Sequence, residues 1–194
     1  MRDPRVQAGY MKDVAAALAR LGPTGAAIRA ADEALFTEIA GVPRSAWLPI
    51  SLNVRWVEAV ERELGWPSGL EFLAARVSDQ FDNPMFRSFV QGGVRLLGLD
   101  PGALLRLIPR GLSIVFRDCG EWSAERTSTT HTELRAQALP KEVAGHARWI
   151  ESIGASALAM FALCGVQGRI ALAEHQPSAG RATVAASWEP ASRA

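Results

Sequence analysis

Lysine, cysteine and net charge are all scarce in this chain of 194 residues, and these shortages exclude several classes of function. Only two of the 21 basic residues are lysines, Lys12 and Lys141, and 20 acidic residues leave a net charge of +1. A protein that binds duplex nucleic acid usually carries a basic excess on one face, so nucleic acid is not an expected partner. The two cysteines, Cys119 and Cys164, are too few for a disulfide framework and are expected to stay reduced.

Long apolar runs are also missing. The longest stretch without a charged residue, 152–168, contains three glycines. It is short and weakly apolar for a membrane span, which needs about 20 apolar residues. Residues 1–5 lead into a polar, alanine-rich helix rather than the continuous apolar segment of a signal peptide. We therefore expect no membrane span and a cytoplasmic protein.

Catalytic and metal-binding signatures are absent from the sequence as well. Zinc requires three or four converging cysteine, histidine or carboxylate ligands. The candidate ligands show neither Cys-x-x-Cys nor His-x-x-x-His spacing; they are Cys119, His131, His146, Cys164 and His175. No Gly-x-Ser-x-Gly elbow and no glycine-rich phosphate loop occurs. The sequence therefore predicts no catalytic residue, no cofactor and no metal site, and a protein that is not an enzyme.

The spacing of apolar residues changes near residue 110, from a helical period to alternation. The alternation predicts four strands, at 112–119, 124–138, 167–175 and 181–188, and a long helix over 140–163 lies between the two hairpins. This is an α+β fold with an N-terminal helical layer packed on a small four-stranded antiparallel sheet. Residues 1–190 are expected to form a single domain, in which the helix within 1–22 could be peripheral. Residues 189–194 are expected to be a loose tail.

Two adjacent glycines, Gly92 and Gly93, lie inside a helical pattern, where each costs about 1 kcal/mol relative to alanine. Two explanations for them remain open. Either another helix approaches closely at this point, or the exposed backbone gives access to a ligand.

The aromatic residues of the helical and loop segments are the main candidates for a functional surface. A helical layer over a small sheet could enclose a pocket lined by aromatic rings, whereas exposed tryptophans favour protein interfaces. A plain hydrophobic core is the third alternative. The candidate interface or pocket residues are Trp47, Trp56, Trp66, Phe86, Phe89 and Trp149.

Two functional hypotheses follow from these residues. The first is a non-enzymatic interaction module of a signalling or scaffolding kind, which forms a homodimer through its helical side or binds another protein. The alternative is a sensor domain that binds an apolar small molecule between helices and sheet. A deep apolar cavity would favour the sensor, and a filled core with an exposed apolar patch would favour the interaction module.

Three short apolar stretches carry a resemblance to known proteins: Trp47-Leu48-Pro49-Ile50, Phe86-Arg87-Ser88-Phe89-Val90 and residues 104–110. With the order of elements after them, the chain resembles an uncharacterised myxobacterial paralogue family of about two hundred residues. More broadly, it resembles the ligand-binding fold of haem nitric-oxide sensors, four-vinyl-reductase domains and TRAPP transport subunits. The resemblance implies the α+β fold and, through it, the sensor hypothesis.

The same resemblance carries over no binding residues. Haem nitric-oxide sensors share a Tyr-x-Ser-x-Arg motif and a proximal histidine, but the only tyrosine here, Tyr10, lies in the first predicted helix outside any such motif. Four-vinyl-reductase domains often have a cysteine cluster near the C-terminus, where this chain has only Cys164. The expected haem and metal contacts of these relatives are therefore missing.

Overall fold

The computed structural model describes residues 3–81 and 84–190, and only the backbone of residues 84–86. The first part of the chain contains β1 (Arg5–Gln7), α1 (Ala8–Leu18), α2 (Gly22–Ala31), α3 (Glu33–Ala40), β2 (Trp47–Pro49), α4 (Ser51–Leu64), α5 (Ser68–Gln80), α6 (Pro84–Leu97), α7 (Pro101–Leu105) and α8 (Ile108–Val115). The second part contains β3 (Phe116–Arg117), β4 (Glu121–Ser128), β5 (His131–Gln137), α9 (Lys141–Ala144), α10 (Ala147–Ile153), α11 (Ala155–Cys164), β6 (Gly168–Gln176), the single turn η1 (Pro177–Ala179) and β7 (Arg181–Trp188).

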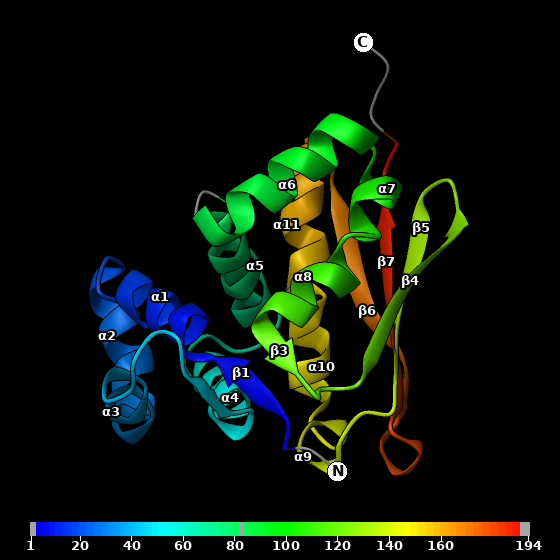
Figure 1. Cartoon of the computed structure of the whole chain (residues 1–194). Helices are drawn as coiled ribbons and strands as arrows, with labels where there is room; N and C mark the ends of the chain where they lie inside the picture. The colour runs from blue at the N-terminus through cyan, green and yellow to red at the C-terminus, as the bar shows by residue number, and fades with distance from the viewer. Residues whose placement is uncertain (1–2, 82–83, 191–194) are drawn as a thin grey trace.

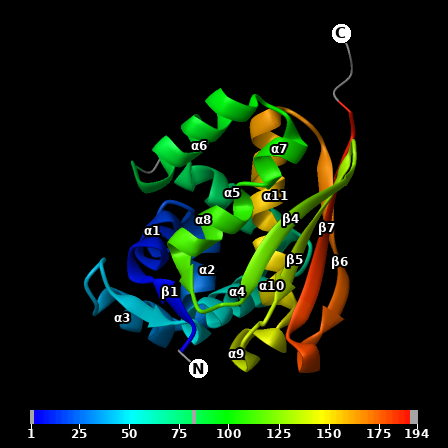
Figure 2. The same ribbon diagram turned by 45° about the vertical axis from the view of Figure 1, so that its right-hand side comes forward.

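The larger sheet confirms the predicted α+β class. Its strands follow the order β4-β5-β7-β6, and all three neighbouring pairs are antiparallel. Helices α10 and α11 run along one face of this sheet, and the N-terminal helices lie beyond them (Figures 1 and 2). The fold therefore stacks a sheet, a central helical element and an outer helical layer.

The N-terminal helices belong to the core because each carries an apolar stripe. In α4 the residues Asn53, Trp56, Val57 and Val60 recur at helical spacing, and all four are buried. Helix α1 likewise buries Met11, Val14 and Leu18 at intervals of three and four residues. The first helix is thus packed into the core.

A second, smaller sheet was not expected from the sequence. Strand β1 pairs antiparallel with β2 on one side and with β3 on the other. Each strand has only two or three residues, too few to establish an alternating pattern. The central residue, Val6, is fully buried, so this sheet anchors the start of the chain.

The predicted strand at 112–119 is wrong. Residues 108–115 form α8, and only Phe116 and Arg117 are extended, in the smaller sheet. Ile108, Leu112 and Val115 are buried at positions i, i+4 and i+7, which makes a helical stripe. Leu112, Ile114 and Phe116 also alternate along the same segment, which is why the sequence pattern suggests a strand. Pro109 lies in the first turn of α8, where its missing N–H costs nothing.

The predicted strand at 124–138 is a hairpin rather than one strand. Strands β4 and β5 are joined by a two-residue turn at Thr129 and Thr130. The alternation of side chains along the sequence continues through this turn without interruption. Because neither residue is a glycine, asparagine or aspartate, the turn has no sequence signature. The sheet still has four strands because the first hairpin is displaced toward the C-terminus.

The predicted long helix at 140–163 is divided into α9, α10 and α11. Gly154 lies at the α10–α11 break, where a Cβ atom would come within 2.3 Å of Ile170 Cδ1 and 3.1 Å of Val184 Cγ1. Glycine is therefore required for the helices to approach β6 and β7 this closely.

One segment, Ala147–Cys164, is long and apolar enough to cross a membrane by length and composition, with mean hydropathy 1.2. Half of it is buried inside the protein, where α11 packs between α5 and the larger sheet. A core helix has the same composition, so the match is weak evidence for a membrane span.

Candidate functional site

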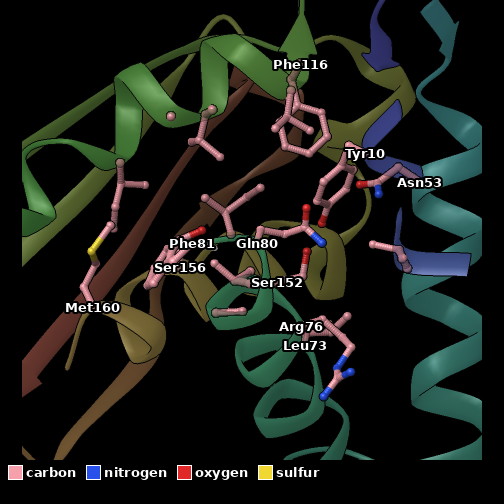
Figure 3. A pocket seen from close by; sticks show the side chains of 18 of the residues that line it. Tyr10, Asn53, Leu73, Arg76, Gln80, Phe81, Phe116, Ser152, Ser156 and Met160 are labelled. Carbon is pink, nitrogen blue, oxygen red and sulfur yellow. The ribbon is translucent and has the colours of Figure 1, made fainter. Parts of the chain in front are cut away.

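An apolar cavity lies between the helical layer and the central α10–α11 element (Figure 3). Its walls come from α1, α4, α5, α6, α8, α10 and α11, and the space accessible to water-sized molecules is about 90 Å³. Seven helices and the start of β3 therefore surround this space.

One end of the cavity is polar. Figure 3 shows the ring of Tyr10, the amide of Gln80 and the side chain of Ser152 pointing toward one another, from α1, α5 and α10. The Tyr10 ring packs edge-on against Phe116, with ring centroids 6.4 Å apart. Burial raises the pKa of Tyr10 to about 12, so this phenol stays protonated at neutral pH. Its hydroxyl has no hydrogen bond within residues 3–81 and 84–190.

A buried hydrogen-bonded chain fixes the helices around this polar end. Trp149 Nε1 donates to Asn53 Oδ1 at 2.8 Å, and Asn53 Nδ2 donates to Met11 Sδ at 3.3 Å. Ser152 Oγ donates to the backbone oxygen of Trp149 at 2.6 Å. Buried polar atoms need such partners, and here the partners connect α1, α4 and α10. Tyr10 directly precedes Met11 in α1, so it lies next to this hydrogen-bonded chain.

The other end of the cavity is mainly apolar. Figure 3 places Phe81, Met160 and the hydroxyl-bearing Ser156 there, away from Tyr10, and Phe89 and Leu107 also line the cavity. Gly111 faces Phe89, and a Cβ atom on it would lie 3.6 Å from the ring. This end is held by van der Waals contact alone and can repack without breaking a hydrogen bond.

No unpaired charge faces the cavity from the described residues. Arg76 contributes its aliphatic stem, while its guanidinium ion-pairs with Asp79 at 2.7 Å and lies 5.4 Å from the centroid of the Phe72 ring. In Figure 3 the guanidinium points away from Tyr10 and Gln80. The site is therefore suited to an uncharged occupant.

The structure brings together only part of the predicted aromatic set. Trp56 and Phe89 line the cavity, and Trp149 is buried beside it, in contact with Phe116 and Asn53. Trp47 and Trp66 are half-buried elsewhere: Trp47 lies under the Arg117 guanidinium at 3.7 Å, and Trp66 lies 5.1 Å from that of Arg148. The side chain of Phe86 lies outside the described residues.

The polar residues of the site were not predicted from the sequence. Tyr10, Gln80 and Ser152 are far apart in the chain and belong to no motif. One signal was present: Tyr10 and Val14 share a helix face, and both line the cavity. The structure explains Gly93 of the pair Gly92-Gly93. A Cβ atom on Gly93 would lie 2.3 Å from Leu107 Cδ1, so close approach of α6 to this side chain requires a glycine.

The cysteines and histidines lie away from this cavity. Cys119 is buried, and burial raises the pKa of its thiol to about 12; burial also raises the pKa of Cys164. His146 Nδ1 lies 3.4 Å from Glu58 Oε1, and His175 Nε2 lies 2.7 Å from the backbone oxygen of Ala144. Within the described ranges, no group of three or more His, Cys, Asp or Glu residues is placed to hold a metal.

Solved structures with a similar fold are H-NOX domains. The Fe(II) unliganded H-NOX protein from K. algicida is 8% identical, with a TM-score of 0.61 over 97% of this chain and 99% of its own. An H-NOX protein from S. oneidensis in the Fe(II)NO ligation state is 9% identical, with a TM-score of 0.57 over 95% and 99%. An oxygen-binding H-NOX domain related to soluble guanylate cyclases is 10% identical, with a TM-score of 0.53 over 94% and 92%.

These similarities establish an H-NOX-like fold. They confirm the fold implied by the resemblance to haem nitric-oxide sensors, whereas the narrower resemblance to the myxobacterial family finds no match. No protein-family model and no curated protein sequence matches the chain.

The described residues of the cavity do not fit a haem. Neither a histidine nor a cysteine lines it, and its volume of about 90 Å³ is well below the roughly 300 Å³ at which ligand pockets begin. Tyr10 and Met160 could ligate iron chemically, but they lie at opposite ends of the cavity in Figure 3. No room for a macrocycle remains between them.

Proposed function

We propose that the protein is a sensor domain that binds a compact, largely apolar molecule in this cavity, without haem. The observation that carries the proposal is the cavity itself, which combines one polar end with apolar walls. Specific ligand sites in proteins have this character. The H-NOX-like fold supports the sensor hypothesis better than the interaction module, because the fold places this cavity at the junction of its helical layers.

The size of the cavity limits the ligand. An apolar cavity of about 150 Å³ takes up benzene or xenon. At about 90 Å³, this cavity admits a smaller molecule unless its apolar end expands.

The walls of the cavity give a route by which binding could be transmitted. Helix α8 continues directly into β3 of the smaller sheet, and α10 packs against β6 and β7 of the larger one. A ligand that displaces α8 or α10 therefore shifts a helix that contacts a sheet. Such a shift requires different affinities for the two arrangements.

The direct test is uptake of xenon, followed by chemical-shift changes in amide NMR spectra. We expect saturable shifts clustered on α1, α8 and α10. Gly111→Leu should fill the cavity and abolish them, since Gly111 has only the Phe89 ring within 4 Å. Gly92→Leu is the matched control, because Gly92 does not line the cavity and a Cβ there meets nothing within 4 Å. Shifts that persist in folded Gly111→Leu protein would refute the proposal.

Self-association is a second candidate function, and an exposed apolar patch favours it. Leu96, Leu97 and Leu99, at the end of α6, are 85%, 41% and 55% exposed. Contiguous exposed apolar residues often mark an interaction surface. Trp56 cannot serve as an anchor there, because it is 1% exposed and packs in the core. Sedimentation of the wild type and of Leu96→Glu tests this: a dimer that dissociates in the variant supports the patch, and a wild-type monomer at tens of micromolar refutes it.

A further inference from the structure

We infer that the ligand of this cavity is an uncharged molecule of about four heavy atoms that carries one hydrogen-bond acceptor, such as a small ketone or alcohol, and that its oxygen binds at Tyr10. The inference rests on the proposed function, whose cavity it uses. It specifies the chemical class of the ligand and the orientation of the ligand in the cavity, and separate experiments can refute each of these two statements.

The acceptor follows from the hydrogen bonds at the polar end. Both functional atoms of the Asn53 side chain are already used, and the Ser152 hydroxyl already donates to a backbone oxygen. The Tyr10 hydroxyl faces the same space and has no partner among the described residues. Buried polar groups are nearly always hydrogen-bonded, so at this end of the cavity the Tyr10 hydroxyl is the donor that a ligand can satisfy. Arg76 Nε is also buried without a hydrogen-bond partner, but the Arg76 guanidinium points away from Tyr10 in Figure 3.

The absence of charge on the ligand follows from the surroundings of Tyr10. Among the described wall residues, Arg76 is the one cationic group, and its guanidinium is paired with Asp79 and turned away from the polar end. The other described wall residues are neutral. The same burial that keeps Tyr10 protonated opposes a buried carboxylate or ammonium. A charged ligand would have no counter-ion in the cavity.

The size of the ligand follows from the volume. Benzene has six heavy atoms and occupies a cavity of about 150 Å³, so about 90 Å³ corresponds to roughly four heavy atoms. Acetone, isobutene and acetate all have this size and a planar, three-armed shape. Isobutene has a CH₂ group where acetone has its carbonyl oxygen, and acetate carries a negative charge, so the three molecules form a matched set of probes.

Ser156 offers the competing orientation. Its hydroxyl lines the cavity, has no hydrogen bond among the described residues, and lies beside Phe81 in Figure 3, away from Tyr10. An oxygen bound there would point in the opposite direction. Removing each hydroxyl in turn therefore decides the orientation.

The experiment is an NMR titration of wild-type, Tyr10→Phe and Ser156→Ala protein with acetone, isobutene and acetate. We expect Tyr10→Phe to weaken acetone binding by about 3–10-fold, the value of one neutral hydrogen bond, and to leave isobutene binding within twofold. Ser156→Ala should change neither by more than twofold, and acetate should show no saturable binding. Unchanged isobutene binding also shows that Tyr10→Phe remains folded.

The outcomes separate the two proposals. If isobutene binds but Tyr10→Phe leaves the ratio of acetone to isobutene affinity unchanged, the inference fails and the proposed function stands. If Ser156→Ala causes the loss instead, the orientation is reversed and the inference fails. Saturable acetate binding overturns the neutral ligand class. If neither isobutene, acetone nor xenon binds, the proposed function fails and the inference fails with it.

Discussion

The two walls of the cavity are built differently. On the side of α1, α4 and α10, the hydrogen bonds of Asn53 and the edge-on contact between Phe116 and Trp149, with centroids 5.7 Å apart, hold one arrangement. On the side of α6 and α8, Phe89, Leu107 and Gly111 meet through apolar contacts. Directional bonds specify a geometry, whereas apolar contacts tolerate repacking of similar volume. Under the proposed function, the first wall positions the ligand and the second adapts to its size.

The largest expected effect comes from breaking the hydrogen-bonded wall. Asn53→Leu leaves Trp149 Nε1 buried without its partner, so we expect the free energy of unfolding to fall by about 2–3 kcal/mol. Urea denaturation measures this loss. Trp149→Phe and the double variant complete a cycle, in which removal of both partners should cost less than the sum of the single losses. Additive losses would show that the hydrogen bond does not couple the two helices.

The second effect depends on pH and on Tyr10. Its folded-state pKa of about 12 lies above the ordinary value of 10, so the unfolded state loses the proton first as pH rises. The stabilising contribution is therefore complete below pH 10 and disappears between pH 10 and 12, with a loss of about 3 kcal/mol. Tyr10→Phe should make this part of the stability profile less steep, and the remaining slope comes from the buried Cys119 thiol, whose pKa is also raised to about 12.

A direct titration is available because Tyr10 is the only tyrosine. Ultraviolet absorbance of the tyrosinate reports this residue alone in the folded protein. A midpoint near the ordinary value of 10 would show that the phenol is solvated and would contradict the burial of the Tyr10 hydroxyl.

The third effect tests the adaptable wall. Phe89→Ala should reduce stability by about 1–2 kcal/mol, less than truncation of a fully buried phenylalanine, because Phe89 is half-buried. It should also enlarge the cavity enough to admit benzene, which the wild type binds weakly. Phe72→Ala is the matched control: Phe72 is also half-buried but does not line the cavity, so a similar loss should bring no benzene binding. Equal benzene binding by both variants would contradict the division into two walls.

The smallest effect is a gain. Gly111→Ala should stabilise the protein by about 0.5–1 kcal/mol, since glycine is a poor helix former and the added methyl group makes ordinary contact with Phe89. Gly92→Ala should give a similar gain in helix stability without touching the cavity. Only the first substitution should weaken xenon binding, and a thermal melt with and without xenon compares the two. Equal xenon responses would place the ligand outside this wall.

The last hairpin was the most predictable part of the fold. Its strands were expected at 167–175 and 181–188 and are observed at Gly168–Gln176 and Arg181–Trp188. Alternation marks both strands, and the turn between them ends at Gly180, whose φ of +59° favours glycine. The first hairpin was displaced because Thr129 and Thr130 continue the alternation through the turn. The small sheet was missed because its strands pair across distant parts of the chain.

The candidate site was predictable only where a single side chain suffices. Trp56 and Phe89 are large and apolar, so composition alone makes them candidates for a core or a pocket. Tyr10, Gln80 and Ser152 acquire their role only when three helices converge. A sequence pattern describes one element at a time, and this convergence depends on tertiary packing that no local period encodes.

The pairing of β1 with β3 also determines the order in which the molecule can assemble. Arg5 lies opposite Arg117 across this pair, so closing it forms a loop of more than one hundred residues. Loop closure of this length is entropically costly, and non-local pairings of this kind slow folding. During synthesis, the helix that carries Tyr10 emerges long before α8 and β3, which complete its surroundings. The face of α1 that later lines the cavity therefore stays unfinished until most of the chain has left the ribosome.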